Sequence, residues 1–246
     1  MTGSSGDVVI AFDLYGTLLS TASIAKQLAD HFGQEKAQSI AAEWRKYQLE
    51  YSWRLTCMGK YEPFSALTLK SLKHTLTEAG VSLEEKDIDS LMKAYDSLST
   101  FPDVQPALST LKKMHGVKPV VFTNGSYEMA SNSVNKSPDL SPHSATFQEL
   151  VVIEEVKKFK PAPEVYKYLA QRVGKTESQM GEMWLVSSNP FDVVGARACG
   201  MNVAWVDRAG MGWTDRLAEE GGGPTVIVKS LGEVIEAVKK HSGLSS

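Results

Sequence analysis

Residues 8–19 read Val8-Val9-Ile10-Ala11-Phe12-Asp13-Leu14-Tyr15-Gly16-Thr17-Leu18-Leu19. The five apolar residues with a β-branched start are typical of a central strand in a parallel sheet, where both faces are covered. Asp13 follows this strand directly, and open α/β sheets place their ligand sites at that end of their strands. A single carboxylate after a strand can also do no more than cap a turn. The rest of the chain decides between a turn and a functional site.

The composition is that of an ordinary soluble globular protein. The chain has 246 residues, of which 42% are hydrophobic and 22% charged, and its formal net charge is −3. At about 150 residues per domain, this length predicts one to two domains. The small negative charge gives no electrostatic basis for binding nucleic acid, and no apolar run approaches the ~18 residues of a membrane span. We therefore expect no nucleic-acid partner and no membrane partner.

Cysteine usage and the N-terminus indicate the compartment. Cys57 and Cys199 lie far apart and lack metal-ligand spacing, which is typical of a reducing environment rather than of a disulfide framework. The N-terminus has neither the basic nor the apolar segment of a signal peptide. We expect a cytoplasmic protein in which residues 1–6 form a mobile tail.

The segment that follows the first strand is helical. Residues 20–99 contain no convincing strand and predict helices at 21–32, 35–58, 63–79 and 84–99. The helix at 35–58 is the clearest, because its apolar residues recur at steps of three and four. About eighty helical residues inserted directly after one strand are typical of a separate cap subdomain.

Beyond residue 100 the pattern alternates between strand and helix. Strands are predicted at 117–123, 149–153, 183–187, 202–206 and 225–228, with helices at 104–114, 126–136, 163–173, 190–199 and 230–241 and a loop at 137–146. Such alternation predicts βαβ units and a parallel sheet. The fold class is therefore α/β: a Rossmann-like, doubly wound, mostly parallel core at 1–19 and 100–246, with a helical cap inserted at 20–99.

Polar clusters follow the predicted core strands. They are Asp-Leu-Tyr-Gly-Thr at 13–17, Thr-Asn-Gly-Ser at 123–126, Lys160 before Pro161, and Ser-Ser-Asn-Pro-Phe-Asp at 187–192. Alone, Lys160 would be a surface lysine and Asp192 a partner of a helix N-terminus. In a parallel sheet, however, the strand ends open onto one edge, so the clusters should meet there. Together they are hard to explain as solvated loops.

In the order and content of these clusters the chain resembles the haloacid dehalogenase superfamily over nearly its full length. Within it, the closer resemblance is to the L-2-haloacid dehalogenases, called type II. The segments that carry it are Phe-Asp-Leu-Tyr-Gly-Thr-Leu at 12–18, Thr-Asn-Gly-Ser at 123–126, Val-Ser-Ser-Asn-x-x-Asp-x-x-Gly-Ala-Arg at 186–197, and the cap segment 44–53.

Two positions depart from the phosphatases of this superfamily. Those enzymes carry Asp-x-Asp-x-Thr, whereas Tyr15 stands at the third position here, and Ser188 stands where they usually carry an acidic residue. A phosphatase needs Mg²⁺ to neutralise phosphoryl charge and an acid to protonate the leaving oxygen. A halide leaves as a stable anion and needs neither. We therefore expect no metal and no cofactor.

The resemblance implies a covalent hydrolysis in two steps. Asp13 would attack C2 of a short 2-haloacid, displacing halide with inversion and forming an ester. Water would then attack the ester carbonyl, so that an L-2-haloacid gives a D-2-hydroxy acid. Lys160 would keep Asp13 ionised, because a nearby cation favours the charged form of a carboxylate.

The resemblance also implies roles for further residues. Asp192 would act as the base. The attacking water would be positioned by Thr17, Ser187, Asn189, Lys160 and Asp192. The leaving halide would be held by Arg45, Asn124 and Phe191, and the substrate carboxylate by Thr123 and the backbone amides of Leu14 and Tyr15. The alkyl part would meet Leu49, Phe64 and the Tyr15 ring, and Tyr166 would hold Asp192 or Lys160 in place.

Lys46 stands where a neutral amide is frequent in that family, which bears on substrate preference. The aromatic cap helix resembles family dimer contacts, so we expect a homodimer that binds a small 2-haloacid and releases halide.

Two alternatives stay open at this point. A Mg²⁺-dependent phosphatase of the same superfamily would hydrolyse an aryl phosphate in a reaction that EDTA abolishes. A catalytically silent, ligand-binding relic of the fold would turn over no 2-haloacid.

Overall fold

The computed structural model describes residues 7–218 and 221–243, so the predicted tail at 1–6 lies outside the described residues. A six-stranded sheet forms its centre, in the order β3-β2-β1-β4-β5-β6, and every neighbouring pair is parallel. This is the strand order of a doubly wound dinucleotide-binding sheet. The strands are β1 (Val8–Phe12), β2 (Val117–Thr123), β3 (Glu149–Val152), β4 (Met183–Ser187), β5 (Asn202–Val206) and β6 (Val226–Val228). The predicted α/β fold class is confirmed.

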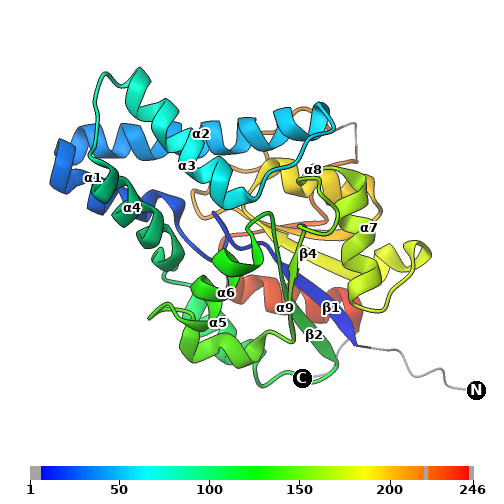
Figure 1. Cartoon of the computed structure of the whole chain (residues 1–246). Coiled ribbons are helices and arrows are strands. Elements are labelled where there is room, and N and C mark those ends of the chain that lie inside the picture. The colour runs from blue at the N-terminus through cyan, green and yellow to red at the C-terminus, as the bar shows by residue number, and fades with distance from the viewer. Residues whose placement is uncertain (1–6, 219–220, 244–246) are drawn as a thin grey trace, which may run out of the picture.

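Helices cover both faces of this sheet. α7 packs beside α8 in one layer and α5 beside α9 in the other, and Figure 1 shows the two layers on opposite sides of the strands. The helices of this part of the chain are α5 (Val104–Leu111), α6 (Tyr127–Asn135), α7 (Pro163–Arg172), α8 (Pro190–Ala198) and α9 (Leu231–Ser242). Covering both faces is what allows the central strands to be apolar throughout.

The register of the sheet sets the height of the strand ends. Phe12, the last residue of β1, is level with Val121 of β2 and Val186 of β4. The backbone N–H of Asp13 then donates to the Val186 carbonyl at 3.0 Å. Asp13 is therefore level with residues 122 and 187, and the polar clusters that follow these strands share one edge of the sheet.

Residues 20–99 contribute no strand to the sheet. They form η1 (Thr21–Ile24), α1 (Ala25–Phe32), α2 (Gln34–Cys57), α3 (Phe64–Glu78), α4 (Glu85–Ala94) and η2 (Tyr95–Ser97). The long α2 crosses above the core in Figure 1 and packs along α3, where the buried Trp44 donates from Nε1 to the Thr68 carbonyl at 2.8 Å. The segment leaves and re-enters the core at one point, since Ser20 N donates to Ser99 O and Phe101 N to Leu18 O.

Two local predictions differ from the structure. The helix expected at 84–99 ends at Ala94 and continues as the tighter 3₁₀ turn η2, which carries the buried Tyr95. The loop expected at 137–146 contains the 3₁₀ helix η3 (Ser141–Thr146). There, the Ser144 hydroxyl donates to the Ser141 carbonyl and Pro142 fixes the first turn, so local bonding produces a short helix from turn-forming residues. A further 3₁₀ helix, η4 (Glu177–Glu182), precedes β4.

Within residues 7–218 and 221–243, no helix has the length and apolar character needed to cross a bilayer.

Candidate active site

Asp13 lies at the end of β1 with its carboxylate almost fully buried. Its Oδ2 accepts hydrogen bonds from the Thr17 hydroxyl at 2.8 Å and from the Asn189 side-chain amide at 2.6 Å. Gly16 turns the loop with φ +88°, and a Cβ there would come within 3.2 Å of the Asn189 amide. The loop therefore surrounds one oxygen of the Asp13 carboxylate, and its hydrogen bonds hold that carboxylate in one orientation.

Lys160 joins this carboxylate to a second one. Its Nζ lies 3.1 Å from Asp13 Oδ1 and 2.8 Å from Asp192 Oδ2, and it also donates to the Phe122 carbonyl at 2.8 Å. The side chain is 1% exposed. A lysine ammonium carries three N–H groups, so these three acceptors use its whole donor capacity. A charged group can lie in the protein interior when all of its hydrogen-bond donors have acceptors in this way.

Asp192 is held from its other side by Tyr166, whose hydroxyl donates to Oδ1 at 2.8 Å. Burial raises the pKa of Asp192 to about 6, against the opposing effect of the Lys160 ammonium. Burial also holds the pKa of Tyr166 well above its usual range, so its hydroxyl stays a donor. The tyrosine reaches this position because residue 195 is glycine: a Cβ there would lie 2.5 Å from the Tyr166 oxygen.

The loop after β4 packs against the loop that carries Asp13. Ser188 N donates to the Thr17 hydroxyl at 2.9 Å, and Asn189 N donates to the Ser187 hydroxyl at 3.1 Å. The Asn189 side-chain amide bridges Asp13 Oδ2 and the Tyr15 carbonyl, the second at 3.0 Å. A carboxylate and a carbonyl oxygen that converge on one point would suit a hard cation, and here they converge on an amide donor instead. In the described part of the chain, no group of three or more His, Cys, Asp or Glu side chains is arranged to hold a metal.

The other side of Asp13 offers hydrogen-bond donors. Leu14 and Tyr15 are buried, yet among residues 7–218 and 221–243 neither backbone N–H has an acceptor. Thr123 is buried beside them, with its hydroxyl accepting from Gly125 N at 3.0 Å, which leaves its own hydrogen available. Buried N–H groups are rarely unpaired in proteins, so this corner is suited to an anion.

The long helix α2 brings Arg45 over the loop at 13–17. Its guanidinium donates to the Tyr15 carbonyl at 3.3 Å and to Gln48 Oε1 at 2.8 Å. Gln48 is itself buried, and it also accepts from the Tyr95 hydroxyl and donates to Thr68. Sequence reasoning missed Gln48 as the residue that aims Arg45. The available signal was a neutral polar side chain on the buried stripe of the helix, three residues after the arginine.

The predicted apolar wall is assembled from aromatic rings. Phe64 stacks on the Tyr15 ring with centroids 6.2 Å apart, and the ring of Phe159 follows at 6.0 Å from Phe64. Leu49 is half-buried on the same helix as Arg45. Phe191 packs its ring edge-on against Trp53, with centroids 5.5 Å apart.

The three residues expected to hold the halide approach from different elements. Arg45 comes from α2, Phe191 from α8 and Asn124 from the loop after β2. Asn124 Oδ1 accepts from Lys160 N at 2.9 Å, which fixes the oxygen there and frees the NH₂ group for another partner. Within the described residues no hydrogen bond joins Arg45 to Asn124, so they form separate walls rather than one cluster.

Comparison with known proteins identifies the relatives of this chain. The family model described as haloacid dehalogenase-like hydrolase matches residues 8–200. The chain belongs to this family. The predictions of the family and of a hydrolase are confirmed. The (S)-2-haloacid dehalogenase H-109 of Pseudomonas putida is 34% identical over 225 residues, covering 92% of this chain and 95% of that protein.

Two further proteins are similar to this member of the haloacid dehalogenase-like hydrolase family. The haloacetate dehalogenase H-2 of Moraxella sp. (strain B) is 31% identical and covers 84% of this chain and 88% of that protein. The solved structure of L-2-haloacid dehalogenase from Xanthobacter autotrophicus, with chloropropionic acid covalently bound, superposes with a TM-score of 0.82. It is 27% identical and covers 97% of this chain and all of the other.

In this haloacid dehalogenase-like hydrolase, a residue that sequence reasoning missed contacts both the loop after β1 and the loop after β4. Arg208, after β5, donates to the Thr17 carbonyl at 3.0 Å and the Ser188 hydroxyl at 3.2 Å. Its Nε pairs with Asp103 at 3.0 Å, and its flat face lies 4.0 Å from the Phe101 ring centroid. The guanidinium thus connects the loop at 13–17 and the loop after β4, by hydrogen bonds, to the point where residues 20–99 rejoin the core.

We expect Arg208→Lys to lower kcat by about 10- to 100-fold while changing KM by less than about threefold, because displaced catalytic loops lose transition-state geometry more than ground-state binding. Lysine keeps the charge and loses the planar fork that reaches three partners. Steady-state kinetics on an accepted substrate give this split.

The matched control for Arg208 is Arg197→Lys. Arg197 is a half-buried arginine that donates to the carbonyls of Gly223 and Met201, away from both catalytic loops. Its replacement should reduce thermal stability and leave kcat close to wild type. Equal losses of kcat in both variants would mean that Arg208 acts through general stability alone.

Proposed function

We propose that this enzyme is a hydrolytic dehalogenase that converts short L-2-haloacids to D-2-hydroxy acids through an ester on Asp13. The observation that carries the proposal is the buried row Asp13–Lys160–Asp192, in which one ammonium contacts both carboxylates. A carboxylate kept ionised and oriented by protein donors is a nucleophile, and a second carboxylate beside it is a base.

In the first step an Asp13 oxygen forms a bond to C2 of the substrate as the carbon–halogen bond breaks, and the halide leaves with the electron pair. The substrate carboxylate is bound by the N–H groups of Leu14 and Tyr15 and by the Thr123 hydroxyl. Two observations support this: among the described residues the two N–H groups have no acceptor, and the Thr123 hydroxyl only accepts a hydrogen bond, so its own hydrogen is available. In-line attack from the Asp13 side inverts C2, so an L-2-haloacid yields a D product.

The departing halide is received by Arg45, Asn124 and Phe191. A guanidinium, an amide NH₂ and the edge of an aromatic ring each present positive charge to a large, weakly hydrated anion. Leu49, Phe64 and the Tyr15 ring form the wall around the alkyl group of the substrate, which is supported by the stacking of Phe64 on Tyr15.

In the second step water attacks the carbonyl carbon of the Asp13 ester and one of its protons passes to Asp192. The bond between that carbon and the substrate oxygen then breaks, and this oxygen takes the proton from Asp192 as the hydroxy acid leaves. The Asp13 carboxyl group, which now carries the water oxygen, loses the second proton to solvent. Both Asp192 oxygens accept one hydrogen bond, and each keeps a second lone pair for the water proton. Thr17, Ser187, Asn189 and Lys160 surround the path of this water, and Tyr166 positions the base.

The phosphatase alternative is disfavoured by the donor set. Asn189 donates to the two oxygens, Asp13 Oδ2 and the Tyr15 carbonyl, that a hard cation would need as ligands. Tyr15 also places an aromatic ring at the position where the phosphatases carry a second aspartate as the general acid. We further propose that residues 20–99 act as a cap over the core 1–19 and 100–246, that the enzyme is cytoplasmic, and that it forms a homodimer.

The first test is release of halide from separate L- and D-2-chloropropionate, with and without EDTA. We expect turnover of the L enantiomer only, unchanged by the chelator, and a loss of about a thousandfold or more in Asp13→Asn, because an amide is a poor nucleophile. Equal rates on both enantiomers would contradict the stereochemistry. Hydrolysis of an aryl phosphate that EDTA abolishes would support the phosphatase instead.

The pH dependence tests the base. Asp192 must be ionised to accept a proton, so kcat should rise with pH through about 6, where burial places its pKa. Tyr166→Phe removes a donor that favours the ionised form, so the pKa of Asp192 rises and the acid limb should move up by about one pH unit. Tyr168→Phe is the control, because Tyr168 lies on the same helix and contacts Arg172 instead. An acid limb that stays in place in Tyr166→Phe would remove Asp192 from this role.

A further inference from the structure

One face of α2 runs along the catalytic loops beyond Arg45. Leu49 and Trp53 follow Arg45 at steps of four, so the three share a face and each lies about 6 Å further along the helix axis. Arg45 reaches the nucleophile loop, and Trp53 contacts Phe191 of α8. Thr56, near the end of the helix, accepts from Phe159 N at 3.1 Å. This face is therefore anchored to the core at both ends.

A pocket of about 390 Å³ opens between this face and the core. Its walls are almost wholly apolar and come from α2, the loop that carries Lys160, the start of α8 and the loop after β5. They consist of Trp53, Thr56, Cys57, Phe159, Pro161, Ala162, Phe191 and Leu217. The one side-chain hydroxyl among them is that of Thr56, which is already bonded to Phe159 N. A ligand of this pocket must be uncharged and apolar.

The pocket adjoins residues of the proposed substrate site. Phe159 and Pro161 flank Lys160 in sequence, so the loop that presents the ammonium to Asp13 also forms a wall of the pocket. Phe191 belongs both to this wall and to the proposed substrate site. Leu49, which faces the substrate alkyl group, lies one helical turn from Trp53. An alkyl chain that runs from C2 along α2 past Leu49 therefore meets the Trp53–Phe191 contact at the edge of this pocket.

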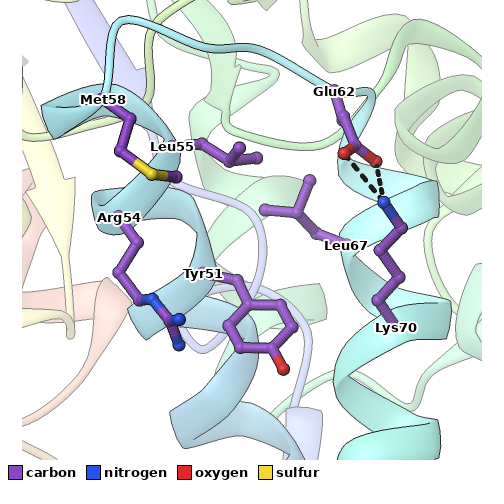
Figure 2. Close-up of a pocket in the computed structure, with 7 residues that line it drawn as sticks. All are labelled: Tyr51, Arg54, Leu55, Met58, Glu62, Leu67 and Lys70. Carbon is purple, nitrogen blue, oxygen red and sulfur yellow. Dashed lines mark hydrogen bonds and ion pairs between the residues drawn. The ribbon is translucent and has the colours of Figure 1, made fainter.

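A second pocket on α2 is different in kind. It lies between α2 and α3, is smaller at about 140 Å³, and is bordered by Arg54 and by the ion pair of Glu62 with Lys70. Figure 2 shows Leu55 of α2 and Met58, the residue after the end of α2, beside this pocket, with the Glu62–Lys70 pair at its edge. Its walls include none of the residues proposed for catalysis, so α2 separates a small pocket bordered by charged side chains from the larger apolar pocket next to the proposed site.

We propose that the apolar pocket is a subsite for the C2 alkyl chain of 2-haloacids longer than 2-halopropionate. This inference rests on the proposed function and extends it to medium-chain substrates. The carboxylate and halogen stay at the loops around Asp13, and the chain extends past Leu49 and over the edge-on contact of Trp53 with Phe191 into the pocket. Each methylene that enters the pocket leaves water, which favours binding.

The test uses unhalogenated acids as inhibitors of halide release from L-2-chloropropionate. Propionate, pentanoate and heptanoate should show Ki values that fall by up to about fourfold per added methylene, as burial of each CH₂ provides. Cys57→Phe fills the pocket from the last turn of α2 and should remove most of this dependence on chain length. Met58→Phe is the matched control, because Met58 is the next residue and lines the other pocket. It should retain the wild-type dependence.

Calorimetric titration of the wild-type protein with the same acids separates the outcomes. Halide release with a Ki independent of chain length would overturn the subsite and leave the proposed function intact. Absence of halide release, with heptanoate still binding more tightly than propionate and Cys57→Phe removing the difference, would overturn the function and keep the subsite. A change in association state in Cys57→Phe without a chain-length effect in wild type would show that a second copy occupies the pocket, and would overturn the proposal.

Discussion

The buried ammonium of Lys160 is the contact on which the rest of this molecule depends. It lies between the carboxylates of Asp13 and Asp192, with the Phe122 carbonyl as its third acceptor. Two carboxylates this deep in a protein would repel each other and lack solvation without a shared cation. Burial raises the pKa of Asp192 to about 6, against the opposing effect of the ammonium. The two carboxylates are thereby paired at one edge of the sheet, as the proposed nucleophile and base require.

The fold supplies this pairing through register and through close approaches. The parallel strands end level with one another, so loops far apart in sequence meet at the same edge. Glycine at 195 lets the Tyr166 hydroxyl reach Asp192, and glycine at 125 lets the Tyr15 ring pack where a Cβ would lie 2.8 Å from it. Helix α2 then covers the edge with an arginine and an apolar stripe. Each contact constrains orientation, which the proposed displacement at carbon requires.

The sequence was sufficient for features that repeat along the chain or lie beside a strand. Periodicity predicted the strands and most helix bounds within about two residues, and the topology of a parallel sheet predicted that Asp13, Lys160 and Asp192 would meet. It could not reveal Arg208, because its contact with Thr17 spans 191 residues, depends on three-dimensional packing and leaves no local pattern. Gln48 was missed although it lies three residues after Arg45 on the same helix, where helical spacing places the two side chains together. The 3₁₀ helix η3 was missed because Ser and Pro favour turns and short helices alike.

The covalent role of Asp13 is tested most directly by isotope labelling during a single turnover. Enzyme in excess over L-2-chloropropionate reacts in water enriched in ¹⁸O, and the peptide that contains Asp13 is then weighed by mass spectrometry. If water attacks the ester carbonyl, ¹⁸O enters the Asp13 carboxylate and the hydroxy acid of the first turnover carries none. If water attacks C2 of the substrate directly, ¹⁸O appears in the hydroxy acid and the peptide stays unlabelled, which would contradict the account.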